Sequence, residues 1–294
     1  MFTCNLCPRK CNIKRKALTD VGKGFCNMGE KPVIARASLH YWEEPPISGT
    51  KGSGTIFFSG CNLKCAFCQN EEISKGCFGK EITVERLREI YFELIEKGAH
   101  NINLVTGTHF INAIAESLKE PLPVPVVYNC GGYENTNALK LLEGKVQIYL
   151  PDLKYSDDEL ALKYSEAPDY FEIATKAIKE MYRQVGNCHF DDNGIMTKGV
   201  IIRHLILPNH LENTKKVIDW VKETFANGEV LFSLMSQFTP NKTCQFPELT
   251  RRLTQEEYDE IEEYLFDSGI EEGFFQELSS AKEEYIPPFN LEGV

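Results

Sequence analysis

Six apolar runs, each bounded by turn residues, recur along the chain from residue 55 onward. They are short and rich in Val, Ile and aromatic side chains, a composition typical of strands buried on both faces. Segments whose apolar residues follow helical spacing lie between these runs and after the last one. The predicted strands are 55–58, 102–105, 125–128, 146–150, 200–207 and 230–235. The predicted helices are roughly 84–97, 110–119, 135–143, 156–184 in two pieces, 212–225 and 254–266.

Alternation of strands and helices on this scale predicts parallel βαβ units joined by right-handed crossovers. Six units are too few for a closed eight-stranded barrel, so we expect an α/β fold: a partial (β/α)6 TIM-like barrel of parallel strands. Thr83 is placed to cap the first helix, and Gly98 to follow its end. The stretch "DDNG" at 191–194 predicts a hairpin turn of the Asn-Gly kind before the fifth strand.

The first 54 residues differ from the rest of the chain. They show no sustained strand or helix period, and they contain four cysteines and the loop-like stretch "EEPPISGTKGSG". We therefore divide the chain into an irregular, cysteine-rich, metal-binding N-terminal extension (1–54), the barrel (55–276) and a C-terminal tail (277–294).

Charge and cysteine content narrow the functional classes. The formal net charge of −11 disfavours binding to nucleic acid or to an anionic membrane surface. No apolar run reaches the length of about 18 residues that a membrane span needs, and the N-terminus lacks the apolar region of a secretory signal. We expect a cytoplasmic protein. Eleven cysteines in a reducing compartment indicate metal binding rather than disulfides.

Cys61, Cys65 and Cys68 follow the first predicted strand with the spacing C-x3-C-x2-C. In parallel α/β folds, catalytic groups gather at the carboxyl ends of strands. A structural zinc site or a simple electron-transfer cluster takes four protein ligands, so three thiolates leave one position of a four-iron cluster open to a small molecule. Alternatively, a remote cysteine completes an ordinary four-ligand site; the candidates are Cys77, Cys130 and Cys188.

The stretch "GCNLKCAFCQN" at 60–70 resembles the signature loop of the radical S-adenosylmethionine (SAM) superfamily. Its flanks, "ISGTKGSGTIFFSGC" and "QNEE", resemble the glycyl-radical activating enzymes, most closely the pyruvate formate-lyase activating enzyme-like branch with a cysteine-rich N-terminus. The resemblance implies a [4Fe-4S] cluster held by Cys61, Cys65 and Cys68, with SAM bound to the open iron. It also implies an anaerobic activity in which SAM is cleaved reductively to a 5′-deoxyadenosyl radical that abstracts hydrogen from a substrate.

The same resemblance suggests further contacts to SAM. Phe67 would pack beside the adenine, unless it is a plain core aromatic. Thr106, Gly107 and Thr108 stand where the family usually has a Gly-Gly-Glu-type turn that contacts the amino group of SAM. The carboxylate is absent here, so hydroxyl and backbone oxygens would replace it. His109 is equally suited to cap the helix that follows.

Charged residues also occur in the fourth and fifth predicted strands. Asp152 and Lys154 point to one face of an extended chain, and burying them is costly unless they are paired or face a polar cavity. Similar enzymes have an Asp-x-Lys pattern near the SAM ribose; the alternative is a structural salt bridge. Arg203 and His204 are adjacent and face opposite ways. We expect Arg203 to point into the barrel, where it could hold a carboxylate, and His204 is equally consistent with a core histidine under a helix.

Cys4, Cys7, Cys11 and Cys26 lie within a short segment and have metal-site spacing. Zinc and a second iron–sulfur cluster both fit, and free thiols are the remaining alternative. The acidic stretch "HYWEEPPISG" at 40–49 is interpreted as a solvated turn without an assigned role.

These observations predict a radical SAM enzyme that takes electrons from a reductant such as flavodoxin or ferredoxin. Its narrower form is an activase that installs a glycyl radical on a partner enzyme. Radical modification of a small molecule or a peptide is the alternative, and RNA is disfavoured by the acidity. Two non-enzymatic classes also remain, an iron–sulfur electron carrier and a zinc-stabilised interaction protein. The barrel residues do not specify the substrate.

Overall fold

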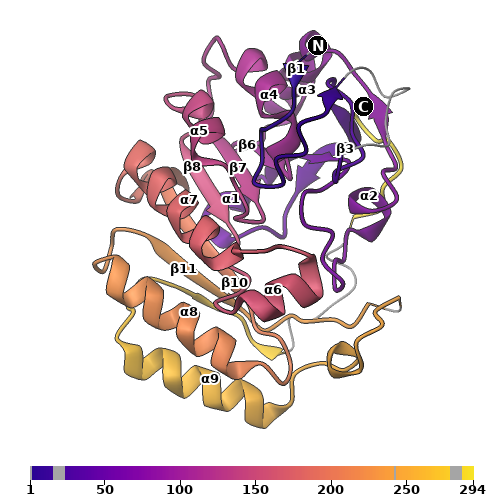
Figure 1. The fold of residues 1–294 in the computed structure, drawn as a ribbon. Coiled ribbons are helices and arrows are strands. Elements are labelled where there is room, and N and C mark those ends of the chain that lie inside the picture. The colour runs from indigo at the N-terminus through magenta and orange to yellow at the C-terminus, as the bar shows by residue number, and fades with distance from the viewer. Residues whose placement is uncertain (1, 16–23, 242, 279–286) are drawn as a thin grey trace.

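The structure, a computed structural model, describes residues 2–15, 24–241, 243–278 and 287–294. Its centre is a curved sheet in which six neighbouring strands run parallel (Figure 1). In spatial order they are β4 (Ser53–Phe58), β6 (Ile102–Val105), β7 (Val126–Cys130), β8 (Ile148–Pro151), β10 (Met196–Leu205) and β11 (Leu231–Met235). Each overlaps one predicted strand, which confirms the α/β fold with an open, mostly parallel barrel.

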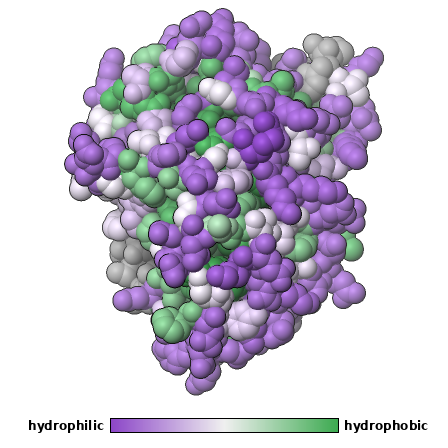
Figure 2. All heavy atoms as spheres, turned by 90° about the vertical axis from the view of Figure 1, so that its left-hand side faces the viewer, coloured by the Kyte–Doolittle hydropathy of each residue, from purple (hydrophilic) through white to green (hydrophobic). Residues whose placement is uncertain are grey.

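Helices form an outer layer around this sheet (Figure 1). They are α3 (Val84–Glu96), α4 (Ile111–Ser117), α5 (Thr136–Leu139), α6 (Asp158–Ser165), α7 (Tyr170–Val185), α8 (Leu211–Thr224) and α9 (Gln255–Ser268). The hydroxyl of Thr83 accepts a hydrogen bond from the backbone N–H of Arg86 at 3.1 Å, as predicted for the cap of α3. Hydrophilic residues dominate the outward face of the helical layer, with apolar residues in scattered patches (Figure 2). In the described ranges, no helix has the length and apolarity required to cross a bilayer.

The predicted hairpin before the fifth barrel strand is also present. Strand β9 (His189–Phe190) pairs antiparallel with the start of β10. The turn between them is closed by a hydrogen bond from the N–H of Gly194 to the carbonyl of Asp191 at 3.0 Å. Gly194 has φ +75°, a left-handed conformation that favours glycine at this position.

The segment predicted to be irregular contains a long strand, and that prediction was wrong. Strand β3 (Val33–His40) pairs antiparallel with β4 and extends the sheet, followed by the short β5 (Lys80–Glu81). At the opposite edge, β12 (Gly273–Phe275) pairs parallel with β11. Before β3, a two-stranded sheet of β1 (Phe2–Thr3) and β2 (Lys14–Arg15) carries the first cysteines.

The short helix α1 (Pro45–Ser48) lies at the end of the barrel where the strands begin. Ile47 is fully buried in an apolar cluster with inward-facing residues of β7, β8, β10 and β11. The side-chain amide of Asn101 donates to the carbonyl of Ile47 at 2.7 Å and fixes the helix. This placement carries Glu43 and Glu44 into the interior, with only 6% of Glu44 exposed. The interpretation of this stretch as a solvated acidic turn was therefore wrong.

Because Ile47 fills the end of the barrel where the strands begin, Ile47→Ala is expected to lower the free energy of unfolding by about 2–5 kcal/mol. The change removes buried methyl groups and leaves a cavity between four strands. Leu162 is a matched control, since it is 56% exposed on α6 and its replacement by alanine should cost less than about 0.5 kcal/mol. Urea unfolding of the two variants measures both values. Equal losses would show that α1 does not pack in this way.

Candidate active site at the carboxyl ends of the strands

The three-cysteine loop leaves β4 at its carboxyl end, and each sulfur has a hydrogen-bond donor. Ser165 Oγ donates to Cys65 Sγ at 3.0 Å, and Ser74 Oγ donates to Cys68 Sγ at 3.4 Å. The backbone N–H of Leu63 lies 3.3 Å from Cys61 Sγ. Donors of this kind stabilise thiolates and tune iron–sulfur clusters.

Cys65 is buried, and Cys61 and Cys68 are partly buried beside it. Burial, together with the neighbouring thiols of Cys65 and Cys68, raises the pKa of Cys61 to about 12. Burial and Cys65 also raise the pKa of Cys68. Ionising several buried thiols side by side requires a compensating positive charge, which a metal centre supplies.

None of the three remote cysteines is among the thiols that raise the pKa of Cys61 and Cys68. Cys188 packs at the amino end of β10, with Sγ 3.6 Å from the carbonyl of Val200. Cys130 is buried beside Glu134, and Cys77 lies by Lys64. Within the described ranges, no three His, Cys, Asp or Glu side chains are arranged to hold a single metal ion. Three thiols in one loop, each with a hydrogen-bond donor, fit a [4Fe-4S] cluster with three protein ligands.

A charged cavity of about 250 Å³ lies beside the loop. Its walls include Cys65, Cys68, Phe67, Asp152, Lys154 and Arg203. Asp152 accepts from Lys154 Nζ at 2.5 Å through one oxygen and from Arg203 Nε at 2.9 Å through the other. Burial pushes its pKa upward, but the guanidinium of Arg203 and the ammonium of Lys154 hold the pKa of Asp152 below its usual value. The structure therefore gathers a carboxylate and two cations next to the cysteines.

Asn129 and Glu43 complete this charged group, and the sequence assigned Glu43 no role. Asn129, on β7, accepts from Arg203 Nη2 at 2.7 Å. Glu43 accepts from Arg203 Nη1 at 3.3 Å and from the amide of Asn129 at 3.3 Å. The available signal was the pair of acids directly before two prolines in the segment leading to β4.

Arg203 points into the barrel, as we expected, and His204 points away from it. His204 Nδ1 lies 2.6 Å from the carbonyl of Leu153, and its Nε2 lies 2.9 Å from the hydroxyl of Thr214 on α8. Burial lowers the pKa of His204 to about 4. His204 is thus a neutral core histidine under a helix.

His204→Gln is expected to weaken the pH dependence of stability between about pH 5 and 6.5. The folded pKa lies below the unfolded value of about 6.5, so the unfolded chain binds the extra proton first and stability falls as the pH falls through this window. The slope in the wild type should exceed that of the variant by about 1 kcal/mol per pH unit. Urea unfolding at several pH values measures both slopes, and parallel slopes would contradict the buried neutral state.

The turn after β6 does not contribute its side chains as predicted. Thr108 Oγ1 donates to the buried carboxyl of Glu134 at 2.5 Å. His109 Nε2 lies 2.8 Å from the carbonyl of Ser59, and helix α4 begins without a side-chain cap. His109 therefore does not cap this helix, which was one of the two alternatives that the sequence left open for it. Of this region only Val105 lines the cavity.

The structure also shows the surroundings of Thr106, Gly107 and Phe67. Thr106 has φ +62°, and its N–H donates to the carbonyl of Asn129 at 2.8 Å. Gly107 packs so closely on Ile114 that a Cβ would lie 2.4 Å from its Cδ1. Phe67 lines the cavity and packs edge-on against Tyr155, with ring centroids 6.4 Å apart.

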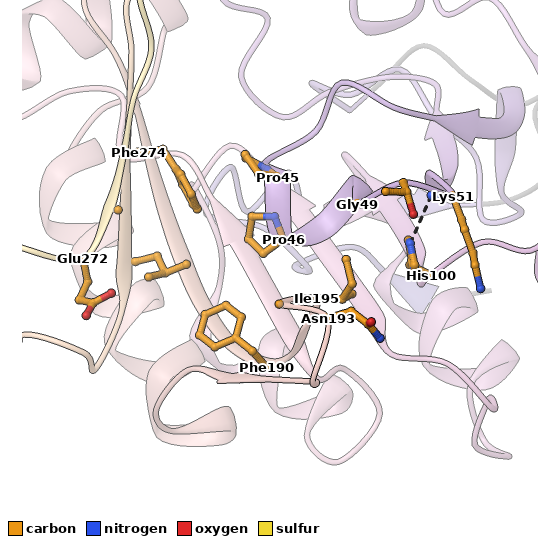
Figure 3. A pocket seen from close by; sticks show the side chains of 14 residues that line it. Pro45, Pro46, Gly49, Lys51, His100, Phe190, Asn193, Ile195, Glu272 and Phe274 are labelled. Carbon is orange, nitrogen blue, oxygen red and sulfur yellow. Dashed lines mark hydrogen bonds between the residues drawn. The ribbon is translucent and has the colours of Figure 1, made fainter.

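Larger cavities are also present, and two of them border the barrel. One, of about 610 Å³, shares Trp42, Glu43, Arg203, Met235 and Gln237 with the charged cavity and so continues it along the open side. The other, of about 750 Å³, lies at the amino ends of the strands, where Pro46, Ile195 and Phe274 surround it (Figure 3). In that cavity the N–H of Lys51 donates to His100 Nε2 at 3.3 Å. It contains none of the predicted site residues.

The four N-terminal cysteines also come together. Burial raises the pKa of Cys7 to about 12, and the thiols of Cys26 and Cys4 add to this effect. Burial likewise raises the pKa of Cys26, which also has Cys4 and Cys11 as electrostatic neighbours. Cys26 therefore lies near all three other thiols.

An open parallel barrel that presents three thiols and a charged cavity at one end defines a class of enzyme that binds an iron–sulfur cluster with a small charged molecule beside it. Residues 55–276 match the model of the Radical SAM superfamily, and the chain belongs to this superfamily. Membership implies SAM and a [4Fe-4S] cluster as cofactors, for which Cys61, Cys65 and Cys68 provide a fitting donor set.

The chain is also similar to several known proteins. An uncharacterized protein of Methanocaldococcus jannaschii is 32% identical over 275 residues, covering 89% of this chain and 73% of that protein. A crystal structure of methylornithine synthase matches 80% of this chain and 64% of its own, with 16% identity and a TM-score of 0.50. A spore photoproduct lyase variant matches 74% of this chain and 75% of its own, with 12% identity and a TM-score of 0.50. At such identities the two structures show a shared fold.

Proposed function

We propose that this radical SAM enzyme abstracts a hydrogen atom from a peptide segment, and specifically from a glycine of a partner enzyme. With the cluster and SAM bound, the superfamily's chemistry supplies reductive cleavage of SAM to methionine and a 5′-deoxyadenosyl radical. The observation that carries the proposal is the three-cysteine loop beside a charged cavity that continues along the open side of the barrel.

The cavity residues have distinct proposed tasks toward SAM. Lys154 and Arg203 are the cations that would receive its carboxylate, and Asp152 would orient its ribose hydroxyls. Phe67 would pack on the adenine. The side chain of Thr108 is occupied by Glu134, so Glu43, the second carboxylate in the cavity, is the proposed partner of the amino group. Enclosure of these groups also limits the access of water to a radical.

A peptide substrate is favoured by the second cavity. This second cavity has a volume of about 610 Å³. It is bordered by Tyr41 and Trp42, which are 50% and 61% exposed. Exposed aromatic side chains at the rim of an opening are common in sites that bind another chain. The cluster would receive its electrons from a one-electron carrier such as flavodoxin or ferredoxin.

The test uses the anaerobically reconstituted full chain with dithionite and SAM. Formation of 5′-deoxyadenosine supports the enzyme. Visible absorbance and reduction without SAM cleavage would instead indicate an electron carrier, and a colourless zinc protein would indicate an interaction module. Peptides with a central α-deuterated glycine then test the substrate class. Deuterium in the 5′-deoxyadenosine supports abstraction from glycine. If every such peptide gives 5′-deoxyadenosine without deuterium, the result contradicts abstraction from glycine.

We also infer that Cys4, Cys7, Cys11 and Cys26 hold a metal centre of their own. The support is the gathering of buried thiols in a segment with few other core residues.

A further inference from the structure

The N-terminal cysteines belong to a small unit that packs directly on the signature loop. We call residues 2–15 and 24–29 the cysteine module. We propose that this module holds a second [4Fe-4S] cluster, with Cys4, Cys7, Cys11 and Cys26 as its ligands, and that Arg9 places one positive charge beside both clusters. The proposal rests on the metal centre inferred above and does not depend on SAM cleavage or on the substrate.

Backbone contacts fold the module around its sulfurs. The N–H of Cys4 donates to the carbonyl of Ile13 at 2.8 Å, and the N–H of Asn12 returns to the carbonyl of Cys4 at 2.9 Å. Lys10 and Asn12 both have positive φ, of 44° and 52°, so the chain turns sharply on either side of Cys11. Such turns bring sequential cysteines to one side of a loop.

The sulfurs of the module also receive hydrogen bonds. The N–H of Phe25 lies 3.4 Å from Cys11 Sγ, and Arg15 Nη1 lies 3.9 Å from Cys4 Sγ. These donors match in kind the hydroxyl and N–H groups that surround the signature cysteines. Hydrogen bonds to sulfur are among the main means by which a protein stabilises a cluster.

The module packs against the signature loop, and this contact favours a cluster over zinc. An iron–sulfur cluster relays electrons and gains from a position beside the signature cluster, whereas a structural zinc ion has no redox chemistry and needs no such contact. Cys4, Cys7, Cys11 and Cys26 supply the four thiolates that such a cluster takes.

The module touches the signature loop at Gly60, the residue before Cys61. A Cβ at this position would lie 2.6 Å from the carbonyl oxygen of Cys26 and 2.5 Å from Cγ of Met28. Gly60 has φ +79° as well, so both the space and the conformation require glycine. The two cysteine groups are therefore in backbone contact.

Arg9 makes the second connection. Its Nε donates to the carbonyl of Asn62 at 2.7 Å, and its Nη2 donates to the carbonyl of Ser165 at 2.9 Å. Ser165 is the residue whose hydroxyl donates to Cys65. The guanidinium also stacks on the ring of Phe25 at 3.6 Å.

The charge of Arg9 acts on both cysteine groups, since it has Cys7 and Cys61 as electrostatic neighbours. A reduced cluster carries one more negative charge than an oxidised one. A fixed cation nearby therefore favours the reduced form of each cluster and raises both reduction potentials.

The first experiment counts metal in two variants. In the Cys61→Ala, Cys65→Ala, Cys68→Ala variant, we expect about four iron and four sulfide per chain to remain, with the electron paramagnetic resonance signal of a reduced cluster. The Cys4→Ala, Cys7→Ala variant should lose a comparable amount of iron from the wild-type total. One zinc per chain in the triple variant would overturn the proposal. It would also be overturned if the triple variant held no metal while the Cys4→Ala, Cys7→Ala variant kept the full iron content of the wild type. If the first variant does not fold, the wild-type iron and zinc contents and the second variant decide the same question.

The second experiment titrates the potentials. Arg9→Gln is expected to shift the reduction potential of both clusters to more negative values and to leave the iron content unchanged. Lys119→Gln is the matched control, because Lys119 lies on the surface and bonds only to Glu116 in the described contacts. A shift in one cluster alone, or no shift in either, would contradict the shared position of Arg9.

Discussion

Replacing Cys65 with alanine is expected to abolish the formation of 5′-deoxyadenosine, with a loss of at least about a thousandfold. Two cysteines remain in the loop of this variant, too few to hold the cluster at three of its irons. Cys65 is buried and also accepts the hydroxyl hydrogen bond of Ser165. Product formation with dithionite and SAM, measured chromatographically under anaerobic conditions, gives the result.

Three controls decide whether the loop has a fourth protein ligand. Cys77→Ala, Cys130→Ala and Cys188→Ala are each expected to retain SAM cleavage, because none of these thiols is among those that raise the pKa of Cys61 and Cys68. Loss of activity and of iron in any one of them, equal to the loss in Cys65→Ala, would mean that the cluster is closed by protein. The open iron, and with it the proposed chemistry, would then be wrong.

Ser165→Ala gives a graded comparison. It removes one donor from Cys65 Sγ and leaves all three ligands, so the cluster should form at normal iron content with a lower reduction potential. Loss of iron in this variant would show that the serine is needed for assembly.

The barrel strands were predictable because each is a short apolar run buried on both faces, a property that the local sequence records directly. Strand β3 was not predicted because residues far away in the sequence cover its polar face. Arg36 forms a salt bridge of 2.6 Å with Glu292, and the N–H of Ala37 donates to the carbonyl of Glu292 at 2.8 Å. Contacts between residues more than 250 positions apart leave no periodic signal in either segment.

The same distinction between local sequence and long-range contacts applies to the candidate site. Asp152, Lys154 and Arg203 were predictable, because a charged residue at the end of an apolar strand must find a polar environment. Glu43 was not, because its position in the barrel depends on the packing of Ile47 in α1. Thr108 was misjudged for a related reason: its partner Glu134 comes from the loop after the next strand, and the turn alone does not reveal it.

Asp152→Asn is expected to have the second large effect, on both stability and SAM binding. Asp152 is the described partner of Lys154 and one of two carboxylates bound by Arg203, and all three side chains are less than 20% exposed. Removing its charge leaves the buried Lys154 without its described carboxylate and Arg203 with Glu43 alone, which costs about 3–5 kcal/mol of unfolding free energy. Because the cations hold the pKa of Asp152 below its usual value, this contribution is present at neutral pH and is lost only as the pH falls through that lowered pKa. Glu43→Gln should cost less, since Arg203 keeps Asp152.

The double variant Asp152→Asn, Lys154→Met separates a structural salt bridge from a cofactor role. Removing both charges relieves the uncompensated ammonium, so much of the lost stability should return. If the pair only supports the fold, SAM affinity and 5′-deoxyadenosine formation return with it. If Lys154 and Asp152 hold SAM, stability recovers while SAM affinity stays reduced by about tenfold or more, which corresponds to about 1.4 kcal/mol for one lost charged contact. Urea unfolding and equilibrium dialysis with SAM on the same preparations distinguish these outcomes, and we expect the second, because both side chains line the cavity beside Cys65 and Cys68.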